Sequence, residues 1–380
     1  MRIGEIRTYH VDLNPTPLRG TPTARRCGPF AAQAGALMVE ISTDDGLTGY
    51  GLGGGGLASA LIIDRHLKEF LIGRDPRDVE KIWDELYAVT SIYGRRGLPV
   101  MAISGIDLAL WDIVGKAAGK PVYRLVAKNP RTRFPAYATS GDFGMAVEQG
   151  FRGVKLAIPY GVADGQKGFD ENLRLVREAR RQIGPEVELM TDVYLKWDVD
   201  YTLRFARAAR DAELKWIEEP IPVDDYEGMA RLCREVRNTL IVSGEHEFTR
   251  YGFRELLRYK ASQILQPDIS WAGGFSECLK IAALGAKEGI PTWPHQGGTP
   301  WGLHLIACLP LPAWAETWGP SARPPQNELF QRLRPAVTRG EFLLNDQPGF
   351  GVELDRTLLE QAVSGRKLVG VQVPLSAPRF

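Results

Sequence analysis

Glu188-Leu-Met-Thr-Asp192 is the first of six short apolar runs that each carry an acidic or basic group at or near the end. The other five are Lys215-Trp-Ile-Glu218, Leu240-Ile-Val-Ser-Gly-Glu245, Ile264-Leu-Gln-Pro-Asp268, Pro291-Thr-Trp-Pro-His295 and Ala313-Trp-Ala-Glu316. Steps of 26, 27, 23, 27 and 21 residues separate these groups, which is the length that a strand, a helix and two loops need. The stretch therefore predicts a repeated βα unit with one chemical group at the carboxyl end of each strand. In a (β/α)8 barrel these ends lie on one face, so we expect the six groups to converge.

The regions on either side of this stretch complete the predicted architecture. Two earlier barrel strands are predicted at 134–140 and 153–159. The N-terminal region shows strand patterns near 2–9 and 36–42, a hairpin signal at Asp44-Asp45-Gly46, and helical periodicity near 58–71, 77–89 and 98–118.

The repeat disappears after about Ala322, and we expect Pro348–Leu354 to form a loop and an edge strand that leave the barrel and pack on the N-terminal domain. The predicted fold class is therefore α/β, a (β/α)7-8 TIM-type barrel at 131–321. An α+β capping domain at 1–130 precedes it, and the C-terminal segment at 322–380 completes that domain.

Composition limits the possible functions. The chain has 380 residues and 44% hydrophobic content, and its 47 basic and 46 acidic residues give a net charge of +1. Such a balance gives no reason to expect nucleic acid or membrane as a partner. The four cysteines are scattered without a CxxC pair, and no apolar signal core or run of 18 apolar residues is present. We therefore expect a soluble cytoplasmic protein.

Asp192, Glu218 and Glu245 are the candidate metal ligands. They end three consecutive predicted strands, so their carboxylates would repel one another without a cation. Hard oxygen donors without Cys or His favour Mg2+, which keeps positions open for water and substrate. Each residue alone is better explained as a helix cap or a surface ion pair, but the three in register predict a metal site.

Asp268 and His295 are the candidate catalytic pair on the next two strands. A carboxylate beside a histidine fixes its tautomer and raises its basicity. Glu316, on the last strand, could donate a hydrogen bond to a developing oxyanion if protonated, or could be structural. A divalent metal facing such a base suits removal of the proton α to a carboxylate, because the metal stabilises the resulting enediolate.

Two N-terminal segments could influence a site. The Pro- and Arg-rich loop from Asn14 to Ala32 contains Arg25 and Arg26, which are candidate substrate-binding residues if the loop covers the site. The loop could equally be a solvated connection. Gly53-Gly-Gly-Gly56 does not fit the phosphate-binding patterns, so we interpret it as a mobile entry to the next helix.

The chain resembles the enolase superfamily, specifically the mandelate racemase-like acid-sugar dehydratases and most closely the L-rhamnonate dehydratase group. The motifs that carry the resemblance are Asp107-Leu-Ala-Leu-Trp-Asp-Ile-Val-Gly, Trp216-Ile-Glu-Glu-Pro, Ser243-Gly-Glu-His-Glu and Gln266-Pro-Asp-Ile. The resemblance implies that His295 is the base and that Glu316 supports the enediolate. It also implies that His246 contacts substrate, and it supports the three metal ligands.

The second predicted strand departs from the racemases of this family. They carry Lys-x-Lys there, whereas this chain has Lys155-Leu-Ala157 and so lacks the second base. A single histidine base favours elimination of water from an aldonate such as L-rhamnonate or L-lyxonate, giving a 2-keto-3-deoxy acid. Lys155 is a candidate ligand of the substrate carboxylate, or a lysine extending from a strand end. An epimerase, a cycloisomerase and a non-catalytic enolase-like protein are the alternatives, and barrels of this kind often form homo-oligomers.

Overall fold

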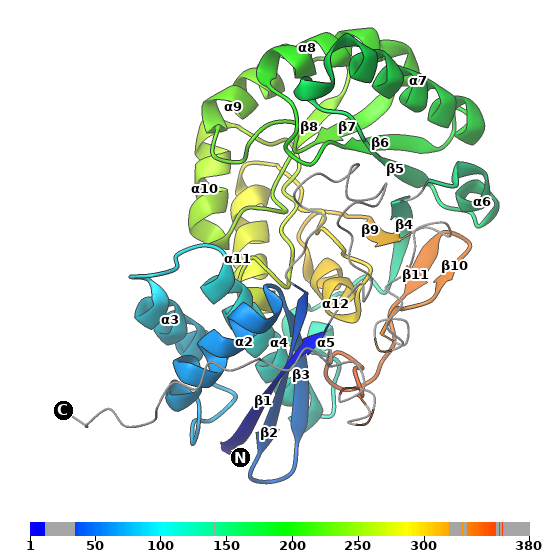
Figure 1. Cartoon of the computed structure of the whole chain (residues 1–380). Coiled ribbons are helices and arrows are strands. Elements are labelled where there is room, and N and C mark those ends of the chain that lie inside the picture. Colours follow the sequence, from blue (N-terminus) through cyan, green and yellow to red (C-terminus); the bar gives the residue numbers. More distant parts are fainter. Residues whose placement is uncertain are drawn as a thin grey trace.

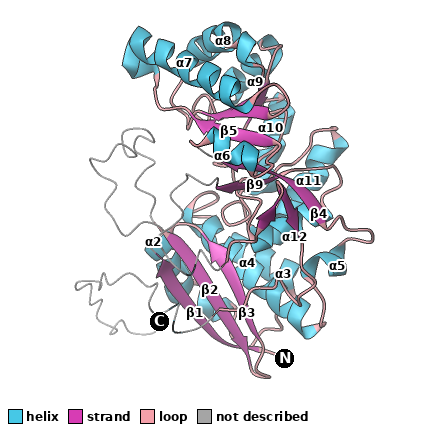
Figure 2. Ribbon diagram, turned by 90° about the vertical axis from the view of Figure 1, so that its right-hand side faces the viewer, coloured by secondary structure: helices cyan, strands magenta, loops and turns pink. Residues whose placement is uncertain are grey.

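The computed structural model describes residues 1–11, 35–139, 141–318 and 333–354, together with the single residues 329, 357 and 359. Its N-terminal sheet is antiparallel, with strands β1 (Ile3–Val11), β2 (Ala36–Thr43) and β3 (Thr48–Gly53) in that order. The helices that follow are α2 (Gly56–Arg65), η2 (Leu67–Phe70), α3 (Val79–Thr90), α4 (Leu98–Ala117) and α5 (Val122–Val126). Figure 2 shows this α+β domain below the barrel. The helix predicted near 58–71 is interrupted at His66, and a 3-10 turn replaces its last part.

Helix α4 packs closely on β3 because glycines remove side chains from the strand face that it covers. A Cβ atom on Gly49 would lie 2.2 Å from the carbonyl oxygen of Ala109, and one on Gly51 would lie 2.0 Å from that of Gly105. Among the described residues, α4 is the one helix long and apolar enough to cross a membrane. Because 78% of its apolar window is buried in the protein, it is a core helix.

The barrel strands run parallel and neighbour one another in chain order. They are β4 (Arg133–Thr139), β5 (Gly153–Ala157), β6 (Glu188–Asp192), β7 (Leu214–Glu218), β8 (Leu240–Val242) and β9 (Ala315–Trp318), which pairs with β4. Isolated parallel bridges extend the series beyond β8: Ser243–Leu265, Leu265–Thr292 and Asp268–His295. The predicted sixth and seventh strands therefore lie in the barrel without forming regular ladders. Pro267, Pro291 and Pro294 lack the N–H groups that a ladder needs.

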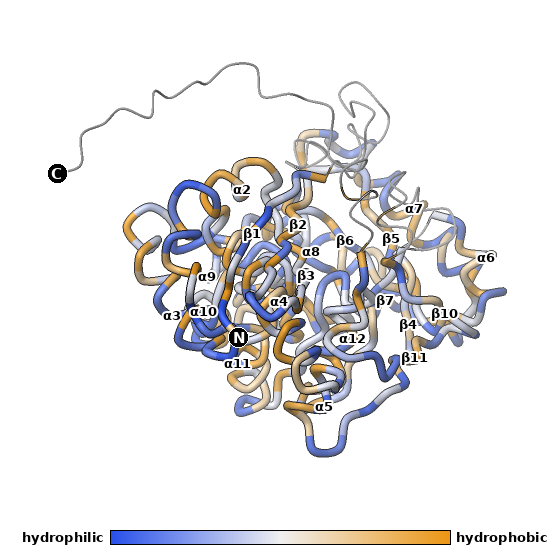
Figure 3. Tube along the Cα trace, turned by 90° about the horizontal axis from the view of Figure 1, so that it is seen from below, coloured by the Kyte–Doolittle hydropathy of each residue, from blue (hydrophilic) through white to orange (hydrophobic). Residues whose placement is uncertain are grey.

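Helices surround these strands. They are α6 (Phe143–Glu148), η3 (Val162–Asp164), α7 (Gly165–Ile183), α8 (Val199–Ala208), η4 (Arg210–Ala212), α9 (Tyr226–Glu235), α10 (Thr249–Tyr259), α11 (Gly274–Lys287) and α12 (Pro300–Cys308). In Figure 1, α7 to α10 curve around the outside of β5 to β8. Along the tube in Figure 3, hydrophilic and hydrophobic stretches follow one another. In α7 the buried positions Phe169, Leu173, Val176 and Ala179 recur at helical spacing, which is the pattern of one face packed on a sheet.

The described part of the C-terminal segment contacts both domains. Strands β10 (Val337–Thr338) and β11 (Glu341–Leu343) form a hairpin whose second strand pairs antiparallel with β4. This hairpin, which precedes Pro348–Leu354, therefore packs on the barrel. Farther on, the predicted edge strand is reduced to a single bridge between Gly349 and Pro121. Phe350 N donates to the buried Asp112 Oδ1 of α4 at 2.8 Å, so this part contacts the N-terminal domain.

Candidate metal centre and acid–base pair

The three predicted metal ligands meet at the carboxyl ends of adjacent strands. Asp192 and Glu218 end β6 and β7 and are partners in the strand register, and Glu245 follows β8. One carboxylate oxygen from each of the three residues lies within 4.8 Å of the others. All three side chains are buried. The parallel strands thus bring together carboxylates that are far apart in the sequence.

This acidic cluster needs positive charge. Burial and the neighbouring carboxylates, against the attraction of Lys155, raise the pKa of Glu218 to about 8. Burial likewise raises the pKa of Glu245 to about 7 and raises that of Asp192. Ionised carboxylates are stable in such a place only with a cation, and three oxygen donors fit a hard divalent ion. The donor set therefore suits a metal of the Mg2+ type.

A second group that could hold a metal consists of Glu219, Glu245 and His246. Glu219 is less available, because its Oε1 accepts backbone hydrogen bonds from His246 N at 3.1 Å and Gly244 N at 3.4 Å. Its Oε2 lies 2.5 Å from His246 Nδ1. Burial raises the pKa of Glu219, but His246 outweighs it and the net shift is downward. Glu219 therefore holds the His246 ring, and the group of Asp192, Glu218 and Glu245 is the better metal site.

Lys155, in β5, extends its side chain into the acidic cluster. Its Nζ lies 2.7 Å from Glu218 Oε1, 2.8 Å from Glu316 Oε1 and 3.4 Å from Asp192 Oδ2, and the side chain is 1% exposed. Burial opposes its charge, but these carboxylates raise the pKa of Lys155 well above its usual value. The lysine therefore neutralises the cluster in this arrangement, whereas the sequence predicted a ligand of the substrate carboxylate.

His295 and Asp268 form the predicted pair. His295 Nδ1 lies 2.7 Å from Asp268 Oδ2, so Nδ1–H donates to the carboxylate and Nε2 is left facing Glu245 Oε1 at 3.3 Å. Ser270 N and Oγ donate to Asp268 Oδ1 at 2.7 and 2.5 Å and fix the carboxylate from its other side. Burial lowers the pKa of His295, but Glu245 and then Asp268 outweigh it and raise the value to about 10.

Glu316 is held as a carboxylate. Thr139 Oγ1 donates to its Oε1 at 2.5 Å and Gln296 N donates to its Oε2 at 2.9 Å, while Lys155 contacts Oε1. Burial raises its pKa, but the charges of Lys155 and His295 outweigh it and lower the value to about 2. An ionised Glu316 accepts hydrogen bonds, so the donor role that required a protonated Glu316 is not the one this arrangement supports.

Strained backbone surrounds the site. Among non-glycine residues, Tyr194, Leu195, Glu219 and Gln296 have φ values of 54°, 59°, 41° and 48°. They directly follow strand ends that carry metal ligands or the catalytic pair. Left-handed conformations in non-glycine residues cost free energy and cluster at functional sites. These four left-handed residues therefore lie at the same place as the metal ligands and the catalytic pair.

Several supporting residues were not singled out from the sequence. Glu219 and Thr139 each lie at the end of a barrel strand, and that position was the available signal. Gln266 Nε2 donates to Glu218 Oε2 at 2.9 Å; this residue begins the Gln266-Pro-Asp-Ile motif, but the sequence did not indicate its contact with Glu218. No sequence signal identified Ser270 as the partner of Asp268. The predicted substrate-binding residues Arg25 and Arg26 lie outside the described residues.

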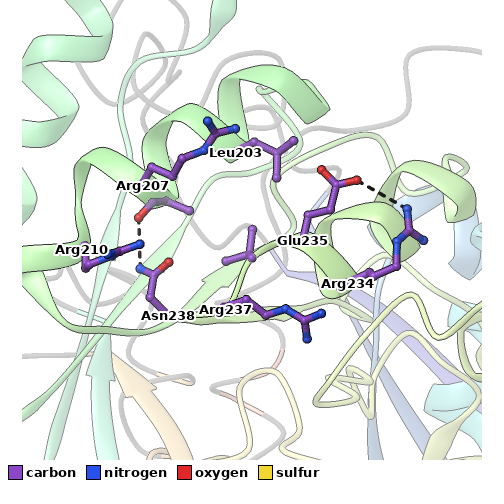
Figure 4. Close-up of a pocket in the computed structure, with 9 residues that line it drawn as sticks. Leu203, Arg207, Arg210, Arg234, Glu235, Arg237 and Asn238 are labelled. Atoms are coloured by element: carbon purple, nitrogen blue, oxygen red, sulfur yellow. Dashed lines mark hydrogen bonds and ion pairs between the residues drawn. The ribbon is translucent and has the colours of Figure 1, made fainter.

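A cavity of about 540 Å³ lies near the amino-terminal ends of β7 and β8, away from the metal centre (Figure 4). Four arginines line it, of which Arg207 and Arg234 lie in the last turns of α8 and α9. The carboxyl end of a helix favours a nearby cation, which accounts for these two arginines without a ligand. None of the site residues predicted from the sequence lines this cavity.

Known proteins share this arrangement of domains. Residues 143–358 match the family described as Enolase C-terminal domain-like, and residues 14–127 match the mandelate racemase/muconate lactonizing enzyme N-terminal domain. The L-rhamnonate dehydratase of Saccharopolyspora erythraea is 38% identical over 328 residues, covering 84% of this chain and 83% of that protein.

Solved structures agree. The rhamnonate dehydratase from Gibberella zeae complexed with Mg superposes with a TM-score of 0.86 at 31% identity, covering 96% of this chain and 98% of that one. The 3,6-anhydro-D-galactonate cycloisomerase from Zobellia galactanivorans has a TM-score of 0.82 at 29% identity, covering 96% of this chain and 99% of that one. The similarity thus extends over both domains.

Proposed function

The chain belongs to the mandelate racemase and muconate lactonizing enzyme group of the enolase superfamily, and on that premise we propose that it is a Mg2+-dependent acid-sugar dehydratase. The observation that carries the proposal is the acidic cluster of Asp192, Glu218 and Glu245 beside the imidazole of His295, which the Asp268 carboxylate holds at Nδ1. A cation and a base held next to each other suit abstraction of the proton α to a carboxylate.

The metal site has a simple role in this proposal. Asp192, Glu218 and Glu245 would hold Mg2+, which when bound stabilises the negative charge that builds up on the substrate carboxylate. Lys155 balances part of the charge of the same residues beneath the site. Once Glu245 is engaged as a ligand, less of its charge acts on His295. The pKa of the imidazole then moves down toward the range in which Nε2 can accept a proton.

His295 would perform both proton transfers. Nε2 takes the C2 proton while Asp268 stabilises the imidazolium through Nδ1–H. The same imidazolium then gives its proton to the C3 hydroxyl, which leaves as water from the same face. The C3–O bond breaks with the electron pair on oxygen, and a C2–C3 double bond forms. The enol tautomerises to the 2-keto-3-deoxy acid, so the net reaction is loss of one water.

The end of β5 argues against proton exchange on two faces. Ala157 is the register partner of the proposed ligand Asp192, at the position where a racemase of this family would carry its second lysine base. A methyl group cannot accept or donate a proton. A base on one face alone supports elimination from one configuration at C2 rather than inversion of that centre.

We propose an aldonate such as L-rhamnonate or L-lyxonate as the substrate, supported by the similarity to rhamnonate dehydratases. Purified protein with Mg2+ is tested against a panel of C5 and C6 aldonates and aldarates, with 2-keto-acid formation followed with semicarbazide. A product that appears with one acid and disappears with EDTA supports the proposal and names the sugar. A panel without any product contradicts it.

A cycloisomerase or epimerase is the second candidate, because the cycloisomerase from Zobellia galactanivorans shares the fold over nearly the whole chain. Such an enzyme would convert an acid without net loss of water, which mass spectrometry of the product distinguishes directly. We also propose that the enzyme works in the cytoplasm as a homo-oligomer on a small acid sugar.

A further inference from the structure

The side chain of Trp271 lies between the two imidazoles of the site. Its ring centroid is 5.9 Å from that of His295 and 5.7 Å from that of His246, with the ring planes tilted by 50° and 54°. These separations are typical of aromatic rings in contact. Each imidazole is held at Nδ1 by a carboxylate, so the indole restricts both rings on a further side.

The backbone of Trp271 belongs to the turn that fixes the partner of His295. Trp271 N donates to Asp268 O at 3.0 Å. Ser270, one of the two residues between them, uses its N and Oγ to hold the Asp268 carboxylate at 2.7 and 2.5 Å. The carboxylate that orients the imidazole and the indole that packs against it therefore form one rigid unit.

Two hydrogen bonds join the N-terminal domain to this turn. Gly54 N donates to Ser270 O at 3.2 Å, and Trp83 Nε1 donates to Gly273 O at 2.7 Å. Gly54 also faces the indole directly: a Cβ atom on it would lie 2.6 Å from both Cδ1 and Nε1 of Trp271, a separation that real Cβ atoms do not show, and 2.9 Å from Sδ of the flexible Met101 side chain. The backbone of Gly54 is not in the left-handed region, so the close approach, and not φ, requires the glycine. This contact gives the Gly53–Gly56 motif a structural purpose.

We propose that Trp271 is a positioning residue for the His295–Asp268 pair and that Gly54 supplies the space which its position requires. The catalytic part of this inference rests on the proposed function, because it concerns the proton transfers of His295. The packing part does not, since it depends only on the contact between the two domains. If the indole is displaced, the His295 ring has room to rotate, because its hydrogen bond to Asp268 alone does not fix the plane of the ring.

The test is a double-mutant cycle of Gly54→Ala, Trp271→Ala and the double variant, with Gly4→Ala as the matched control. Gly4 lies in the same domain, and its Cβ would meet other atoms only at ordinary distances of 3.7 Å and beyond. Steady-state kcat and KM are measured with the acid sugar found in the panel, and Mg2+ affinity is measured by calorimetry. Thermal unfolding of the wild type and of these four variants without substrate provides a readout besides activity.

Gly54→Ala is expected to lower kcat by about tenfold to a hundredfold, because a misplacement of ~1 Å can cost that much. KM, Mg2+ affinity and the Gly4→Ala control are expected to stay near wild type. In the Trp271→Ala background, Gly54→Ala is expected to have no further effect on kcat. Losses that multiply in the double variant, or an unchanged kcat in either single variant, would overturn the proposal.

The unfolding data separate this inference from the proposed function. Gly54→Ala should lower the unfolding temperature when Trp271 is present and lower it much less when residue 271 is alanine, because only the flexible Met101 side chain then has to move. Equal shifts in both backgrounds would refute the contact whatever the activity. A wild-type protein that dehydrates no acid sugar would instead refute the proposed function, and the unfolding cycle would still decide the packing claim.

Discussion

Replacing Lys155 by methionine removes the one side-chain cation within 3.4 Å of Asp192, Glu218 and Glu316 among the described residues, at nearly constant volume. Removing one partner of a buried ion pair costs about 3–5 kcal/mol, because the other charges stay buried without compensation. An unfolding entropy of ~2.1 cal/mol/K per residue over 380 residues amounts to about 0.8 kcal/mol/K. The unfolding temperature of the metal-free variant should therefore fall by about 4–6 °C.

The assay is differential scanning calorimetry in EDTA and in excess Mg2+. The matched control is Lys215→Met, since Lys215 Nζ lies 2.7 Å from Glu188 Oε1 but the two side chains are 23% and 40% exposed. An exposed pair of this kind is worth at most about 1 kcal/mol. In excess Mg2+ the unfolding temperature of Lys155→Met should lie closer to that of the wild type than it does in EDTA, because a bound cation replaces part of the missing charge. Equal unfolding temperatures of the two variants in EDTA would refute the electrostatic reasoning.

Three further predictions concern single residues. His295→Asn should lower dehydration at least about a hundredfold, because it removes the base, while Mg2+ binding measured by calorimetry stays near wild type; retained turnover would assign the base elsewhere. Glu245→Gln should weaken Mg2+ binding at least about tenfold, and an unchanged affinity would contradict its role as a ligand. Burial lowers the pKa of His304 from 6.5 to about 3, so the folded protein keeps the imidazole neutral while the unfolded chain binds a proton. Stability should therefore fall between about pH 6.5 and pH 3, and unfolding temperatures across this range should fall less steeply in His304→Phe; parallel curves would contradict the pKa shift.

The sequence predicted the convergence of the acidic groups because a parallel barrel leaves little freedom. Asp192, Glu218 and Glu245 each follow a short apolar run, and the carboxyl ends of parallel strands lie on one face whatever the details of the loops. His295 and Asp268 followed from the same argument. The spacing of the runs was enough, because the period of the βα unit is set by the lengths of its parts.

The spacing of the apolar runs could not predict which side chains of the site contact one another. The sequence shows that Lys155 is on a strand. It does not show that the Lys155 Nζ reaches three carboxylates, one each on β6, β7 and β9. The bond from Ser270 to Asp268 depends on a turn with no distinctive motif. The contact of Gly54 with Trp271 joins two domains, so no local pattern in either segment indicates it.

The structure also differs from the sequence prediction in where regular strands form. The segments that carry Asp268 and His295 contain prolines, so they occupy strand positions with single bridges instead of ladders. The hairpin of β10 and β11 consists of very short strands, and short strands have no detectable alternation. Its second strand pairs with residues 133–135 of β4, which precede the part of β4 that pairs with β9, and no local pattern indicates this tertiary contact.

The most direct test of the central claim is the fate of hydrogen at C2 and C3 when the acid sugar is turned over by wild-type enzyme with Mg2+ in D2O. A single-base dehydratase should give a 2-keto-3-deoxy acid that carries one solvent deuterium at C3, observed by proton NMR and mass spectrometry. Deuterium at C2 of recovered or epimerised acid, with no 2-keto acid formed, would contradict the claim and assign the site to proton exchange.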